Sequence, residues 1–140
     1  MTLTDEPKTA QSYCRELRNH VAISERSPEQ TQFSLAAIES FESVMGKKEL
    51  LENALLTIVS AARSPHLGPC MIGNELLLAL LADFPEIETV WRSLAKSKQA
   101  HERWVAISVA RDDRFPFLLA QEFAQMAIRD RSAKVRLFGV

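Results

Sequence analysis

The sequence predicts an all-α fold of seven or eight helices, and three observations carry this prediction. Apolar side chains recur at helical spacing along nearly the whole chain. No stretch alternates apolar and polar residues between turn residues, which is the pattern of a half-buried strand. Glycine is scarce, with 4 in 140 residues. At 46% hydrophobic and 25% charged residues, positions 1–140 are expected to form one domain, with 1–6 flexible.

The first half of the chain is expected to form three helices. The first starts near Pro7 and has an apolar stripe made of Tyr13, Cys14, Leu17 and Val21. Ser27 is expected to cap a second helix that begins at Pro28, with Gln30 in the capping-box position. Gly46 ends this helix, whose buried stripe is Phe33, Ala37, Phe41, Val44 and Met45. The third helix has an apolar face made of Leu50, Leu51, Ala54, Leu55, Ile58, Val59 and Ala62.

The segment 64–74 is predicted to be the one long loop. It holds two of the six prolines and two of the four glycines. Asn74 is expected to cap the next helix, ELLLALLA, which is apolar on every side and is therefore predicted to lie at the centre of the fold. Long loops in compact helical domains often carry function, so this segment is a candidate site.

The last third is predicted to hold four helices. After Pro85, an apolar stripe is formed by Ile87, Val90, Trp91, Leu94 and Ala95. Helices are then expected over 100–111 and 115–129, and a short one follows a Ser132 cap. The inward row of the second of these is Phe115, Leu119, Phe123 and Met126. Because the links are short, neighbouring helices must run antiparallel. The prediction is a short stack of antiparallel helical hairpins, and an irregular helical bundle is the alternative.

The C-terminal third resembles the HEAT and armadillo families of helical-hairpin repeats. In DRSAKVR, Asp130 stands five residues before Val135 and six before Arg136, which matches the opening of many HEAT repeats. Arg103 lies 33 residues before Arg136, and small residues follow it at the expected core positions, Ala106 and Ala110.

The resemblance covers mainly residues 97–140, and it departs from the pattern at Ser97, where Asp is usual. It implies a HEAT-like α-solenoid, which presents an extended surface to partners. In that family, Asp and Arg side chains bind the turns of neighbouring repeats together. The residues that the resemblance places in this structural role are Arg103, Asp112, Asp113, Asp130 and Arg136.

Cysteine usage and the N-terminal sequence bear on the cellular compartment. Cys14 and Cys70 have no metal-site spacing and form no disulfide framework, so a reducing cytoplasm is expected. MTLTDEPKTAQ has no apolar core and is not a signal peptide. The longest apolar run, 76–82, is far shorter than a membrane span. We therefore expect a cytoplasmic location and no membrane partner. The sequence also allows this chain to be a piece of a longer protein.

No catalytic constellation is recognisable in the sequence. His66 and Cys70 could act as a base and a nucleophile, but no orienting third residue accompanies them. Cys70 has apolar neighbours and is expected to be buried. His101 and Asp112 lie about three helical turns apart and match no metal-binding or acid–base motif. Neither a metal nor a cofactor is expected.

The function that these observations favour is non-enzymatic binding of another macromolecule, with a protein as the expected partner. Residues 1–95 carry a net charge of −5 and residues 96–140 a net charge of +4, which could orient a partner. The candidate contact residues are the basic side chains Arg111, Arg114, Arg129, Arg131, Lys134 and Arg136. A second candidate surface is the 64–74 segment, with His66 and Cys70.

Two other functions remain as alternatives. HERWVAI followed by ARDD resembles the HEAT-like DNA glycosylases that act on alkylated bases, although Trp91 and Trp104 are expected to be core residues by default. A nucleic-acid binder of that kind needs a broad basic face. A small intracellular inhibitor of the immunity type would instead use the acidic surface of residues 1–95. Separately, a C-terminal apolar turn would allow a homodimer, through Val135, Leu137, Phe138 and Val140.

Overall fold

The computed structural model describes residues 10–24 and 27–137, and this part of the chain is all-helical. It contains eight helices and no strand, which confirms the predicted fold class. The helices are α1 (Ala10–Ser24), α2 (Pro28–Met45), α3 (Leu51–Ala62), α4 (Leu67–Leu81), α5 (Ile87–Ala95), α6 (Ala100–Val109), α7 (Phe117–Ile128) and α8 (Ala133–Leu137).

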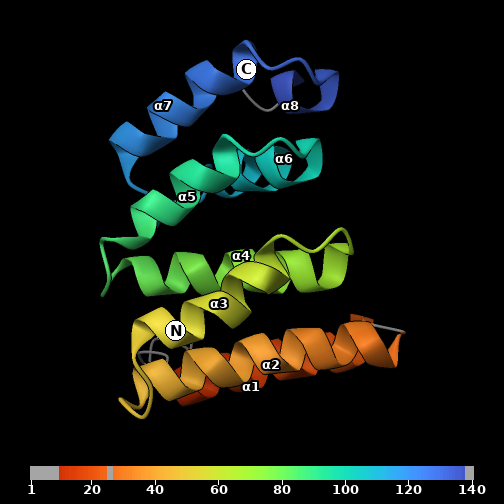
Figure 1. The fold of residues 1–140 in the computed structure, drawn as a ribbon, viewed down its shortest axis with the longest axis vertical. Coiled ribbons are helices and arrows are strands. Elements are labelled where there is room, and N and C mark those ends of the chain that lie inside the picture. Colours follow the sequence, from red (N-terminus) through yellow and green to blue (C-terminus); the bar gives the residue numbers. More distant parts are fainter. Residues whose placement is uncertain (1–9, 25–26, 138–140) are drawn as a thin grey trace, which may run out of the picture.

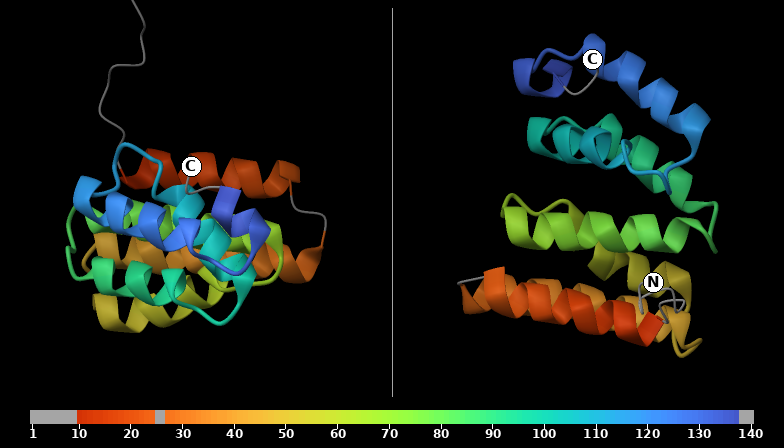
Figure 2. Two further views of the ribbon diagram at one scale, coloured as in Figure 1. Left: turned by 90° about the horizontal axis from the view of Figure 1, so that it is seen from above. Right: turned by 180° about the vertical axis from the view of Figure 1, so that it is seen from behind.

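The helices are arranged as successive pairs along the longest axis of the molecule. Figure 1 shows α1 and α2 at one end, then α3 with α4, α5 with α6, and α7 with α8 at the other end. The same succession is visible from behind in Figure 2. The even-numbered helices form a continuous row, because α2 contacts α4, α4 contacts α6 and α6 contacts α8. This arrangement is a short stack of helical hairpins.

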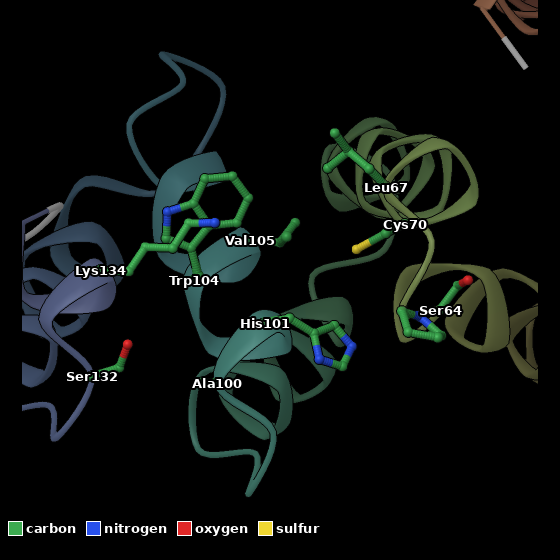
Figure 3. Close-up of a pocket in the computed structure, with 10 residues that line it drawn as sticks. Ser64, Leu67, Cys70, Ala100, His101, Trp104, Val105, Ser132 and Lys134 are labelled. Carbon is green, nitrogen blue, oxygen red and sulfur yellow. The ribbon is translucent and has the colours of Figure 1, made fainter.

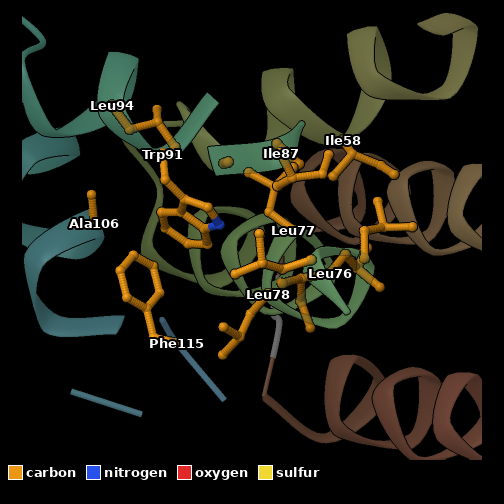
Figure 4. Packing of buried hydrophobic residues seen from close by; sticks show 14 of the residues in the cluster. Ile58, Leu76, Leu77, Leu78, Ile87, Trp91, Leu94, Ala106 and Phe115 are labelled. Carbon is orange, nitrogen blue, oxygen red and sulfur yellow. The ribbon is translucent and has the colours of Figure 1, made fainter. Parts of the chain in front are cut away.

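Helix α4 is the centre of the stack, as its sequence predicted. It contacts five other helices, α1, α2, α3, α5 and α6. In Figure 4, its residues Leu76, Leu77 and Leu78 lie among buried side chains of α3, α5 and α6. Each fully buried leucine contributes roughly 1.5–3 kcal/mol to stability. A helix that is apolar all round is stable only in such a position.

The predicted loop over 64–74 is wrong, because α4 already begins at Leu67. Gly73 is not a helix breaker here: it lies against α3, and a Cβ at this position would meet the backbone nitrogen of Ala62 at 2.3 Å. Pro69 is accommodated in the first turn of α4, where its missing N–H costs little. The true link between α3 and α4 is only residues 63–66.

Asn74 is likewise not a helix cap but a buried residue in the middle of α4. Its Nδ2 donates hydrogen bonds to the carbonyl oxygen of Ala62, at 3.2 Å, and to that of Cys70, at 2.8 Å. One amide therefore ties the end of α3 to the first turn of α4. Asparagine is a common N-cap residue, which led to the prediction, but here its side chain makes a contact between two helices.

The predicted boundaries of α2 are confirmed. Ser27 is the N-cap, its Oγ accepting the Gln30 N–H at 3.5 Å, and Pro28 is the first helical residue. Gly46 follows the last residue, but the left-handed backbone belongs to Lys47, with φ of 59°. The buried stripe is wrong at one position, since Phe33 is 43% exposed.

Other predictions are confirmed in outline. Trp91, Phe115, Leu119 and Phe123 are buried. Helix α7 begins after Pro116 rather than at Phe115. Two predictions lie outside what the structure describes: a start of α1 near Pro7, and the side chains of Leu137, Phe138 and Val140. Val135 of the same C-terminal turn is fully buried.

No helix in the described ranges has both the length and the apolar character needed to cross a membrane.

Candidate functional site

A pocket of about 390 Å³ lies where three even-numbered helices begin. We call it the α4–α6–α8 pocket (Figure 3). Its walls come from the α3–α4 link and the first turns of α4, α6 and α8. The lining residues are Ser64, Pro65, Leu67, Cys70, Ala100, His101, Trp104, Val105, Ser132 and Lys134.

The three links that lead into the pocket use the same local hydrogen bond. In each, a side-chain oxygen accepts the backbone N–H of the residue two positions later. Ser64 Oγ accepts from His66, and Ser97 Oγ accepts from Gln99, both at 3.1 Å. The equivalent bond joins Asp130 Oδ1 to the N–H of Ser132, at 2.8 Å. Such turns fix how the chain enters the following helix, so short polar links position all three helix starts.

Cys70 lies in the pocket wall as a neutral thiol. Its Sγ donates to the carbonyl oxygen of Ala62 at 3.1 Å. Burial, together with the nearby negative charge of Glu102, raises the pKa of the Cys70 thiol to about 11. A thiol with this pKa is almost wholly protonated at neutral pH and is a poor nucleophile. Cys14 is also buried, and its pKa is raised to about 11 for the same principal reason.

The structure does not bring His66 and Cys70 together as a base and a nucleophile. His66 is exposed at the N-cap position of α4 and lines a different depression, which it shares with Gln30 and Phe33. Cys70 faces the α4–α6–α8 pocket instead. Of the two residues expected from this segment, only Cys70 belongs to the candidate site.

An aromatic ring and a cation form the opposite wall. The Nζ of Lys134 lies 4.3 Å from the centroid of the Trp104 ring, a cation–π contact. Trp104 is partly buried rather than a full core residue, in contrast to Trp91. His101 reaches across toward the α3–α4 link, with its Nε2 3.3 Å from the carbonyl oxygen of Arg63. Figure 3 shows these side chains around one space.

A buried ion pair holds the α7–α8 link against α6, just before the short helix that carries Lys134. Arg103 Nε and Nη2 donate to the two carboxylate oxygens of Asp130, at 2.8 and 2.9 Å, and both side chains are 9% exposed. Arg103 Nη1 also donates to the carbonyl oxygen of Ser97. The Arg103 guanidinium lowers the pKa of the Asp130 carboxyl. Arg136 completes the contact by donating to the carbonyl oxygen of Asp130 at 2.6 Å.

Among the residues expected to join neighbouring turns, Asp112 behaves differently. It bonds within its own link, where Arg114 donates to it from both the backbone and the side chain, at 2.9 and 3.1 Å. These bonds lower the pKa of the Asp112 carboxyl. His101 is at the start of α6 and Asp112 is beyond its end, so an acid–base pair would have to span about 16 Å of helix.

Glu102 is a buried carboxylate in the first turn of α6. Its Oε2 accepts from Ser97 Oγ at 3.0 Å, and its Oε1 lies 3.5 Å from Arg63 Nε. The residues that the structure describes include no group of His, Cys, Asp and Glu side chains suited to hold a metal ion.

The six basic candidates do not form one surface. Arg111 and Arg114 precede α7, whereas the other four follow it, so the length of α7, about 18 Å, separates the two groups. Arg114 pairs with Glu75 at 3.0 Å as well as with Asp112. Glu75 also accepts from the hydroxyl of Tyr13 at 2.8 Å, so this group joins α1, α4 and the α6–α7 link. Only Lys134 of the six lines the pocket.

Sequence reasoning included Ser64 and Leu67 only as members of the 64–74 candidate segment, without singling them out, and it proposed Ser132 only as a cap. Their common property is position at the start of a helix in the even-numbered row, which becomes visible only when the stack is assembled. No protein-family model matches the chain, and neither do curated proteins or solved structures.

Proposed function

We propose that this protein is a non-enzymatic binding module and that another protein docks a side chain into the α4–α6–α8 pocket. One observation carries the proposal: an exposed apolar residue, Leu67, lines the same pocket as an aromatic ring with a cation over it, Trp104 with Lys134. Leu67 is 63% exposed although it is a leucine in the first turn of the central helix. Apolar anchors surrounded by polar groups are typical of protein interfaces.

The chemistry of the pocket favours binding over catalysis. A nucleophile must be deprotonated or lie beside a base, and Cys70 meets neither condition, because its thiol donates to a backbone carbonyl oxygen. His101 is directed to the carbonyl oxygen of Arg63 rather than to that thiol. The Cys70 thiol and the His101 ring therefore both contact backbone carbonyl oxygens at the end of α3 and in the α3–α4 link.

Nucleic-acid binding is the competing function, and the basic residues around α8 favour it. Arg129, Arg131, Lys134 and Arg136 are exposed within eight residues of one another. However, tight duplex binding typically uses about 6–10 phosphate contacts, and the other two basic candidates lie beyond α7. The net charge of the chain is −1. A protein partner is therefore the better-supported proposal.

The test compares two substitutions of exposed leucines in first helical turns, Leu67→Asp in α4 and Leu118→Asp in α7. Leu118 is 78% exposed and lies away from the pocket. An acidic residue suits the first turn of a helix, so both variants should fold. Tagged wild-type and variant proteins are used to capture partners from a cell extract, and captured proteins are identified and quantified.

We expect a stoichiometric protein that the wild type and Leu118→Asp retain and that Leu67→Asp loses by at least tenfold. Loss from both variants, or from neither, would contradict a partner at this pocket. Duplex and single-stranded nucleic acid are titrated in parallel over a salt series. Binding that weakens steeply with salt and is unchanged in Leu67→Asp would favour the nucleic-acid function instead.

A further inference from the structure

We propose that the α4–α6–α8 pocket receives the C-terminal residue of the partner chain, an apolar side chain together with a free carboxylate. This inference rests on the proposed function and names the chemistry of its ligand. It follows from the charge of the pocket, its apolar wall and its size.

The polar lining of the pocket suits an anion. Among its described lining residues, Lys134 is cationic, Ser64 and Ser132 can donate hydrogen bonds, and none is acidic. Two carboxylates of the same part of the stack are outside the lining: Asp130 is held by Arg103, and Glu102 accepts from Ser97 and lies 3.5 Å from Arg63. A carboxylate entering the pocket therefore meets the Lys134 cation with no acidic lining residue beside it, although the charge of Glu102 reaches the Cys70 side of the wall.

The helix starts add to this polarity. α4 and α6 both begin at the pocket, and neither has a side-chain hydrogen bond at its N-cap, which is His66 in α4 and Gln99 in α6. The first backbone N–H groups of a helix have no intrahelical acceptor, and the helix dipole is positive at this end. The start of α4, whose first turn holds no acidic residue, reinforces the attraction of Lys134 for a negative group, whereas Glu102 occupies the first turn of α6.

The rest of the wall is apolar and close to the cation. Leu67, Val105 and Trp104 line the same space as Lys134. Figure 3 shows Leu67 and Val105 on the side facing the Trp104 ring, with the Lys134 side chain lying along that ring. A ligand that fills this space needs an apolar body and an anionic group a few ångströms apart.

A chain terminus provides this combination on one residue. Its carboxylate and its side chain leave the same Cα, and the backbone departs in only one direction. The volume of about 390 Å³ is near the lower end of the range for ligand pockets, about 300–1,000 Å³, and suits a single terminal residue. Capture of a C-terminal carboxylate is an established mode of peptide recognition.

The experiment titrates the isotope-labelled full chain with acetylated tripeptides and follows its NMR spectrum. The probes are acetyl-Ala-Ala-X, with X as Ala, Val, Leu or Phe, each as the free acid and as the carboxamide. At least one free acid is expected to shift the indole resonance of Trp104 and to bind at least tenfold more tightly than its carboxamide. Trp104→Phe assigns that resonance, because Trp91 is the other tryptophan.

Three variants test the cation. Lys134→Met should weaken binding of the preferred free acid at least fivefold and leave the carboxamide unaffected. Lys134→Arg should restore binding, since it keeps the charge. Lys48→Met is the matched control: Lys48 is exposed in the α2–α3 link, and its loss should change nothing.

Equal binding of acid and carboxamide, or no shift of pocket resonances with any free acid, would overturn the inference. The capture experiment separates this failure from failure of the proposed function. If Leu67→Asp loses a partner while the acids show no preference, only the terminal-residue inference fails. If Leu67→Asp loses no partner, the proposed function fails.

Discussion

Two contacts within the helical stack, one at its centre and one at its C-terminal end, are held together by different forces. Between α3 and α4, contact is so close that the backbone of Ala62 lies against Gly73, and a single side-chain amide from Asn74 bridges the helices. At α8, contact with α6 combines a charged clamp, Arg103 on Asp130 of the preceding link, with one buried apolar side chain, Val135. Close apolar packing fixes one geometry, whereas a short helix on an ion pair can adjust its position at lower cost. The pocket lies at the boundary between these two regions.

Breaking the close packing should have the largest effect. Gly73→Ala places a Cβ 2.3 Å from the backbone nitrogen of Ala62, where no flexible side chain can move away. We expect the free energy of unfolding to fall by more than about 3 kcal/mol, at the upper end of overpacking substitutions. Urea denaturation measures this change. Gly46→Ala is the control: its closest contact is 3.2 Å, at the end of α2, so its effect should stay within about 1 kcal/mol.

Removing the clamp should cost less and act locally. Asp130→Ala leaves Arg103 without its carboxylate and Ser132 without its acceptor, and we expect a loss of about 3 kcal/mol, the lower end of the range for a broken buried ion pair. Hydrogen exchange should accelerate first in α8 and in the first turn of α6. The exposed pair Arg92–Glu122 provides the comparison, since Arg92→Met should cost at most about 1 kcal/mol. Uniform acceleration over the whole stack would show that the clamp supports more than this end.

Acid should weaken the Arg103–Asp130 ion pair, and the resulting loss of stability should be smaller than that caused by Asp130→Ala. Arg103 holds the pKa of Asp130 below its ordinary value, so folding is stabilised above the pKa of the unfolded chain, near 3.9. This stabilisation is lost as pH falls from about 4 through the lower folded pKa. Hydrogen exchange in α8, corrected for its intrinsic pH dependence, should therefore accelerate below pH 4. Asp130→Asn should remove this response while keeping most of the hydrogen bonds.

The same comparison explains what the sequence could and could not predict. Helix α4 was predictable as the central helix because a segment that is apolar on all sides has only one stable position. Its start was mispredicted because glycine is common in loops. Here Gly73 instead allows α4 to pack directly against the backbone of α3. The composition of a glycine-containing segment cannot distinguish these two uses, since the distinction depends on a neighbour eleven residues away.

The pocket was less predictable than the helices. Cys70 and Lys134 were both candidates, but for unrelated reasons and 64 positions apart in the chain. Their meeting depends on how α4, α6 and α8 stack, which helical periodicity does not specify. For the same reason the six basic residues seemed to form one set, although α7 divides them. Local patterns predicted the elements, and only the packing between elements defines the site.

The smallest expected stability effect concerns Lys134. An exposed cation over an aromatic ring stabilises by about 0.5–1 kcal/mol, so Lys134→Met should lower the free energy of unfolding by no more than this. Lys48→Met should have no measurable effect. Denaturation of both variants, followed by circular dichroism, measures the difference. A loss above about 2 kcal/mol would assign Lys134 to the structural clamp with Arg103. A small loss combined with a large effect on binding would instead indicate that the stack holds this cation in place for a ligand.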